Sequence, residues 1–65
     1  MNLIEGLQKE MNRCRELLKQ YEAVGPVGAF AKNMIQGDIR RAEDTIAHGD
    51  TVEMLAAYKQ LQGCK

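Results

Sequence analysis

Gly25-Pro26-Val27-Gly28 is the stretch that separates the first two helical patterns of this 65-residue sequence. Gly25 can end a helix in the left-handed conformation, where a side chain would be strained. Pro26 cannot continue that helix, but its fixed backbone angle suits the first turn of the next one. Gly28 keeps that next turn slim. The stretch therefore predicts a tight reversal between two helices.

The same capping pattern opens the first and the third helical segments. Asn2-Leu3-Ile4-Glu5 stands at the start of the chain, and Asp50-Thr51-Val52-Glu53 follows a second break at Gly49. In this pattern the Asn or Asp side chain accepts a hydrogen bond from a first-turn amide, and the Glu strengthens the start of the helix. The breaks and caps predict one all-α domain with helices over residues 3 to 23, 27 to 48 and 51 to 62.

Apolar residues recur at steps of three and four in each segment, which predicts the faces that pack together. In the first helix they are Ile4, Leu7, Met11, Cys14, Leu18 and Tyr21, widened by Leu3 and Leu17. In the second they are Val27, Ala31, Met34, Ile35, Ile39, Ala42 and Ile46, with Phe30 and Met34 on a flank. In the third they are Val52, Leu55, Ala56, Tyr58 and Leu61.

Two glycines lie inside these patterns. Gly37-Asp38 is ambiguous, because Gly breaks helices and Asp caps them, so one helix could end at Ile35 and another begin at Ile39. The apolar phase continues across the glycine, which favours one continuous helix. Gly6 costs about 1 kcal/mol relative to Ala within a helix, and it indicates a close contact with a neighbouring element.

The lengths of the segments predict how the helices assemble. At 1.5 Å per residue the first two helices are each about 32 Å long and match as an antiparallel hairpin, whereas the third is about 18 Å. The third helix then covers only about half of the hairpin groove. Uncovered apolar surface favours a homodimer that completes a larger helical bundle. The interface candidates are Leu7, Met11, Leu18, Tyr21, Phe30 and Met34.

Three sizeable apolar residues, Val24, Val27 and Phe30, surround the predicted reversal. These side chains are shielded from water only if they pack against another apolar surface. The short third helix is the expected cover, and a groove on a partner protein is the alternative.

Composition limits the function classes. Nine basic and nine acidic side chains cancel, so no overall field attracts the chain to nucleic acid or to an anionic membrane. The sequence has no apolar run of the length that a membrane span needs. Glu5 stands where a signal peptide needs apolar residues, so we expect cytoplasmic residence. Cys14 falls on a core position, and Cys64 is expected as an exposed thiol in a frayed tail.

Two local patterns have a functional and a structural interpretation. Asp44 and His48, with Glu43 beside them, have a spacing that can hold a metal, but an ion pair near the end of a helix is the favoured explanation. The Gly25–Gly28 turn is similar to a phosphate-binding loop only in its glycines, because it lacks a preceding strand and a following Lys-Ser or Lys-Thr pair. We expect a surface ion pair and a helix connection, with no metal or cofactor.

Arg40-Arg41 supports an alternative function, a small nucleic-acid-associated regulator. Acidic residues share the same helical surfaces, and no aromatic residue lies between the basic ones to stack on a base. A single His and the lack of an activated nucleophile argue against an enzyme. The sequence therefore favours a small homo-oligomeric protein-interaction or regulatory module without catalytic activity. Nucleic-acid binding is the less favoured alternative, because the positive and negative charges of the chain balance.

Overall fold

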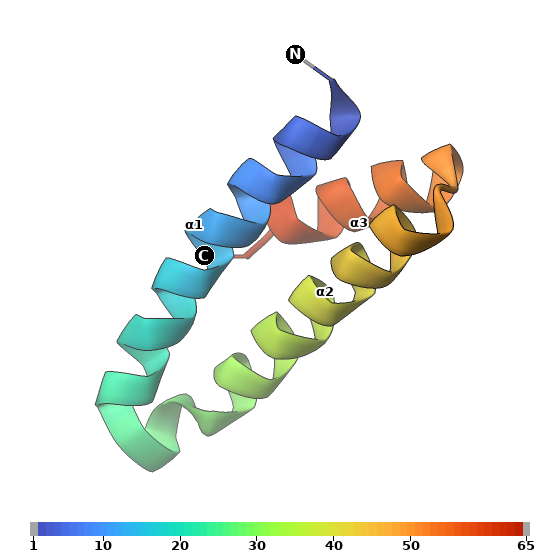
Figure 1. The fold of residues 1–65 in the computed structure, drawn as a ribbon. Helices are drawn as coiled ribbons and strands as arrows, with labels where there is room; N and C mark the ends of the chain where they lie inside the picture. The colour runs from blue at the N-terminus through green and yellow to red at the C-terminus, as the bar shows by residue number, and fades with distance from the viewer. Residues whose placement is uncertain (1, 65) are drawn as a thin grey trace.

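The computed structural model describes residues 2 to 64, and within that range it is helical and contains no strand. Helix α1 spans Leu3–Val24, the 3-10 turn η1 spans Gly25–Gly28, helix α2 spans Ala29–His48, and helix α3 spans Thr51–Gln62. The predicted all-α architecture is confirmed (Figure 1). Helix α2 begins two residues later than predicted, because the Gly-Pro stretch forms a tighter helical turn of its own.

Both predicted caps are present. The Asn2 Oδ1 atom accepts a hydrogen bond from the Glu5 amide at 2.8 Å, and the Asp50 Oδ1 atom accepts one from the Glu53 amide at 3.2 Å. Each bond satisfies a first-turn amide that has no partner within its helix. The caps therefore fix where α1 and α3 begin.

Within residues 2 to 64, Gly25 and Gly49 are the two positions with positive φ. Gly49 adopts the left-handed helical conformation (φ 71°, ψ 19°) and its amide contacts the carbonyl groups of Thr45 and Ile46. Gly25 differs from the left-handed cap expected from the sequence, because its ψ of −144° places it in a region open mainly to glycine. That conformation turns the chain directly into η1.

Helices α1 and α2 form the predicted hairpin, and α3 lies across it, ending beside the middle of α1 (Figure 1). Helix α2 is continuous through Gly37 and Asp38, as the apolar phase predicted. The three helices enclose one core. Its apolar members are Leu7, Met11, Cys14, Ile35, Ile39, Ala42, Met54, Ala57, Leu61 and Cys64.

Gly6 lies at a close approach between α1 and α3, as expected. It is buried, and a β-carbon there would lie 3.2 Å from the Cε2 atom of Tyr58. Tyr58 itself is partly buried against the core. The missing side chain thus makes room for an aromatic ring from the third helix.

The predicted packing face of α3 is confirmed for Leu61 and for the partly buried Tyr58, and it is wrong for Val52 and Leu55. Val52 is 73% exposed and Leu55 is 49% exposed, whereas Met54 and Ala57 are buried together with Leu61. Apolar residues occur on all sides of this helix, so spacing alone did not identify the buried side. The prediction for Val27 is also wrong: it lies in η1, outside α2, and does not reach the core.

Two of the six interface candidates are unsuitable as surface residues in this fold. Leu7 is fully buried and Met11 is 4% exposed, because α3 of the same chain covers this half of the hairpin. Leu18 and Tyr21 are partly buried against the core. Only Phe30 and Met34 are well exposed, and both lie in the first two turns of α2.

Candidate functional site

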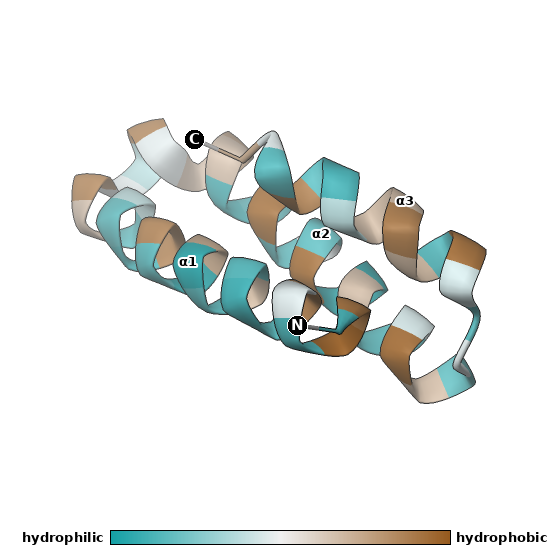
Figure 2. Cartoon of the chain, turned by 90° about the horizontal axis from the view of Figure 1, so that it is seen from above, coloured by the Kyte–Doolittle hydropathy of each residue, from teal (hydrophilic) through white to brown (hydrophobic). Residues whose placement is uncertain are grey.

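The turn end of the hairpin carries a group of exposed apolar side chains, which we call the hydrophobic tip. It consists of Val24, Val27, Phe30 and Met34, with exposed fractions of 56%, 88%, 78% and 57%. The expectation that α3 covers the first three is wrong, because α3 ends beside the middle of α1 and does not reach the turn (Figure 1). Figure 2 shows hydrophobic segments at this end of the ribbon.

The local sequence of the tip is unusually free of charge. Residues 23 to 31 carry no charged or polar side chain, although 28% of the chain is charged. Glu22 and Lys32 lie immediately on either side of this segment. The centres of protein interfaces are depleted of charged residues in the same way, and their rims are polar. The tip therefore has the composition of an interface centre.

An open groove of about 360 Å³, the tip groove, lies next to the hydrophobic tip. Tyr21 comes from α1, and Gln60 with the two residues after α3 forms the far wall. The α2 wall consists of Ala31, Met34, Ile35 and Asp38. The groove exists because α3 is much shorter than the hairpin on which it packs. Met34 belongs both to the groove and to the tip, so the two surfaces are continuous.

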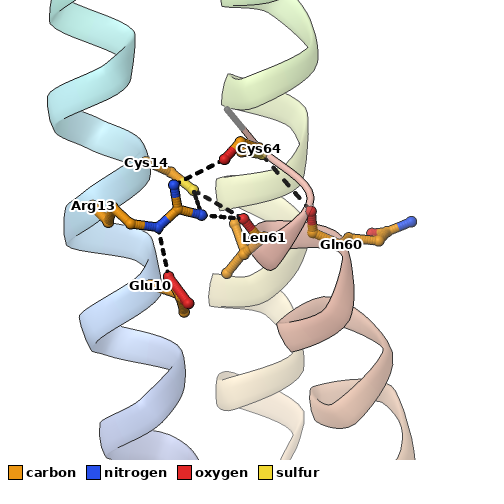
Figure 3. A network of polar contacts seen from close by, with 6 residues as sticks. All are labelled: Glu10, Arg13, Cys14, Gln60, Leu61 and Cys64. Carbon is orange, nitrogen blue, oxygen red and sulfur yellow. Dashed lines mark hydrogen bonds and ion pairs between the residues drawn. The ribbon is translucent and has the colours of Figure 1, made fainter.

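Arg13 holds the end of α3 against α1 (Figure 3). Its guanidinium donates to the Leu61 carbonyl at 2.6 Å and to the Cys64 carbonyl at 2.8 Å. Its Nε atom lies 2.7 Å from Glu10 Oε2, and this hydrogen bond is the main reason that the pKa of Arg13 is raised above its ordinary value. A cation that binds the last carbonyl groups of a helix also interacts favourably with the helix dipole. Arg13 thus holds the end of α3 at the position where the tip groove begins.

The two cysteines lie on either side of the same helix end. The Cys14 thiol donates to the Leu61 carbonyl, at 3.5 Å, and the Cys64 thiol donates to Asp38 Oδ2, also at 3.5 Å. Cys64 is 9% exposed, so the prediction of an exposed thiol is wrong; Arg13 and Asp38 hold it against the core. Burial, followed by hydrogen bonds with Cys14 and Asp38, raises the pKa of Cys64 to about 12. A thiol that stays protonated is a poor nucleophile.

The Asp44 and His48 pair does not form the expected ion pair. The His48 Nδ1 atom lies 2.8 Å from the main-chain oxygen of Asp44, so the contact is with the backbone and not with the carboxylate. Among residues 2 to 64, no three His, Cys, Asp or Glu side chains are grouped so that they could hold a metal ion. These contacts therefore give no support for a metal site at this end of α2.

The basic residues considered for nucleic-acid binding lie among acidic partners. Arg41 is 3.6 Å from Glu53 and donates to Gln60 Oε1 at 3.2 Å, and Arg15 is 3.8 Å from Glu43. Arg40 is exposed on α2. These contacts join α2 to α3 and α1, and they reduce the positive charge that Arg41 presents to solvent.

We expect the Arg13→Ala variant to be less stable than the natural chain by about 1 to 2 kcal/mol. The carbonyl groups at the end of α3 lose their hydrogen bonds to the guanidinium, and the loss is moderate because these bonds are only partly shielded from water. Arg13→Lys should recover part of the loss, since an ammonium keeps the charge but cannot hold both carbonyl groups in one planar fork. Urea unfolding followed by circular dichroism measures both values. Unchanged stability in both variants would contradict a structural role for Arg13.

The sequence pattern identified Phe30 and Met34 as candidate site residues but did not identify Arg13. Arg13 lies on the polar side of the first helical pattern, and its partners are 48 and 51 residues away.

No helix in the described part of the chain has the length and apolar character that crossing a bilayer requires. Comparisons with protein-family models, curated proteins and solved structures found no match to this chain.

Proposed function

We propose that this protein is a homodimeric helical interaction module that pairs through its hydrophobic tip and has no catalytic activity. The observation that supports this function is the exposure of Val27 and Phe30 within a segment that contains no polar side chain. Exposed apolar surface bordered by charged residues is characteristic of a protein interface. The adjoining tip groove provides a concave surface beside the convex tip.

The size of the molecule is compatible with such a dimer. A stable interface removes about 800 Å² of accessible surface from each partner. That area is less than a fifth of the 4485 Å² that the chain exposes. The tip and the tip groove occupy the end of the hairpin that α3 leaves open, so pairing there requires no rearrangement of the core.

A second copy of the chain matches the charges that border the tip. In a twofold dimer both copies use the same surface patch, so every contact between two different residues occurs twice, once in each direction. Glu22 lies in the last turn of α1 and Lys32 in the first turn of α2, on opposite sides of the uncharged segment. A twofold arrangement that sets Glu22 of one copy near Lys32 of the other would leave the apolar residues between these two pairs of charges.

Light scattering coupled to size exclusion tests this proposal. In reducing buffer at micromolar concentration, the natural chain should have a mass near twice 7.3 kDa. Phe30→Ser should be monomeric with an unchanged circular dichroism spectrum, because Phe30 is 78% exposed and contributes little to the core.

Val52→Ser is the matched control, since Val52 is 73% exposed but lies on α3, away from the tip. It should remain dimeric. A monomeric natural chain would refute self-pairing, and equal dissociation of both variants would refute the tip as its site.

A further inference from the structure

The thiols of Cys14 and Cys64 each contact one of two consecutive carbonyl groups at the end of α3. The Cys14 thiol contacts the Leu61 carbonyl at 3.5 Å, and the Cys64 thiol contacts the Gln60 carbonyl at 3.8 Å. Arg13 links the two residues, because its Nη2 atom lies 3.9 Å from Cys14 Sγ while its Nη1 atom binds the Cys64 main chain. Figure 3 shows both cysteines at this single junction.

The Cys14 thiol also affects the pKa of Cys64. A hydrogen bond with Cys14 is one of the causes of the raised pKa of Cys64, after burial. Cys64 lies beyond the last residue of α3, directly after Gly63, and its amide donates to the Leu61 carbonyl at 3.1 Å while Arg13 binds its own carbonyl. Cys14 is fixed in the middle of α1. A bond between the two sulfur atoms therefore needs rotation of the Cys64 side chain away from Asp38 and toward Cys14, with both backbones held in place.

We propose that Cys14 and Cys64 are a modification site, which a small-molecule disulfide such as oxidised glutathione converts to an intrachain disulfide. A thiolate from one cysteine attacks a sulfur atom of the oxidant and releases one glutathione thiolate. The thiolate of the other cysteine then attacks the protein sulfur of this mixed disulfide, forms the Sγ–Sγ bond and releases the second glutathione. The two protons lost by the protein thiols are taken up by the two released thiolates. Two protein thiols are thereby oxidised and one glutathione disulfide is reduced.

The disulfide would replace the hydrogen bonds at this junction with a covalent link between α1 and the end of α3. It restricts the unfolded chain over the long segment between the two cysteines, which favours the folded state. The reduced pair should react slowly, because both thiols are buried and only the thiolate form is nucleophilic. The site therefore responds to sustained oxidation and not to a brief exposure.

Equilibration in buffers of reduced and oxidised glutathione, followed by alkylation and mass spectrometry, tests the proposal. The natural chain should lose two hydrogen atoms, resist alkylation at both cysteines and remain a single covalent chain. Its urea midpoint should increase on oxidation and return to the reduced value with dithiothreitol. Glutathione adducts without the loss of two hydrogens, a covalently linked pair of chains, or a lower midpoint after oxidation would each overturn the proposal.

Cys64→Ser and Cys14→Ala are the control variants. Neither can form the internal bond, so their urea midpoints should be the same after treatment with glutathione disulfide as before, apart from the effect of any adduct detected by mass. An increase in either variant equal to that of the natural chain would also overturn the proposal. The result does not depend on dimerisation, because the site is within one chain and the readout is the mass of that chain.

Discussion

Gly28→Ala should lower the free energy of unfolding by about 1 to 3 kcal/mol, the range typical of side chains forced into filled space. A β-carbon at this buried position would lie 2.6 Å from the main-chain oxygen of Tyr21. That oxygen belongs to α1, so relief of the overlap requires a shift of helix backbone and not of a flexible side chain. A domain of this length has a total stability of roughly 3 to 10 kcal/mol. The substitution should therefore remove a large share of it.

Gly37→Ala is the matched control, and its effect should have the opposite sign. Gly37 lies in the interior of α2, and no atom is within 4 Å of the position that its β-carbon would take. Alanine should stabilise the helix by about 0.5 to 1 kcal/mol. Urea unfolding of both variants at one protein concentration gives the comparison. Destabilisation of similar size at both positions would contradict the close packing of η1 on α1.

Leu61→Ala is expected to have an even larger effect, a loss of about 2 to 5 kcal/mol. Leu61 is one of the largest fully buried side chains and lies where α3 meets the other two helices. Its truncation leaves a cavity, while the main-chain carbonyl that binds Arg13 is retained. The measured loss therefore reports side-chain packing at the end of α3.

Leu55→Ala removes the same atoms from the same helix and provides the control. Leu55 is 49% exposed, so its truncation should change the free energy of unfolding by less than about 1 kcal/mol. Denaturant melts should separate the two variants clearly. If Leu55→Ala were as damaging as Leu61→Ala, the buried face of α3 described here would be wrong.

The sequence was sufficient to place the helices because their boundaries depend on neighbouring residues. Asn2 and Asp50 each cap an amide three positions away, and Gly49 ends α2 through its own backbone angles. Such signals act within a single turn, and nothing distant alters them. The continuity of α2 through Gly37 was predictable for the same reason, since the buried phase from Ile35 to Ile39 follows ordinary helical spacing.

The packing of α3 was not predictable from its own residues. Met54 and Leu55 are adjacent, and both are large and apolar, yet one is buried and the other is half exposed. Their pattern is consistent with more than one buried face. The face that is buried depends on how the short connection through Gly49 directs α3 across the hairpin, and that is a property of three helices together.

The candidate site also depends on distant contacts. Phe30 and Met34 were identified as interface residues from their apolar character, but Leu7 and Met11 share that character and belong to the core. What distinguishes them is where α3 packs on the hairpin, and Arg13 anchors its end through carbonyl groups about 50 residues further along the chain. The spacing of apolar residues within one helix gives no information about a partner so far along the chain.

Because α3 covers only part of the hairpin, local unfolding should require different free energies at its two ends. Amides near Leu7 and Cys14 lie under α3 and can exchange hydrogen only when much of the core opens. The segment around η1 has few buried neighbours, so local unfolding there requires less free energy. A binding event at this end would therefore order the segment that we expect to unfold most readily, and its free energy includes the entropy lost in that ordering.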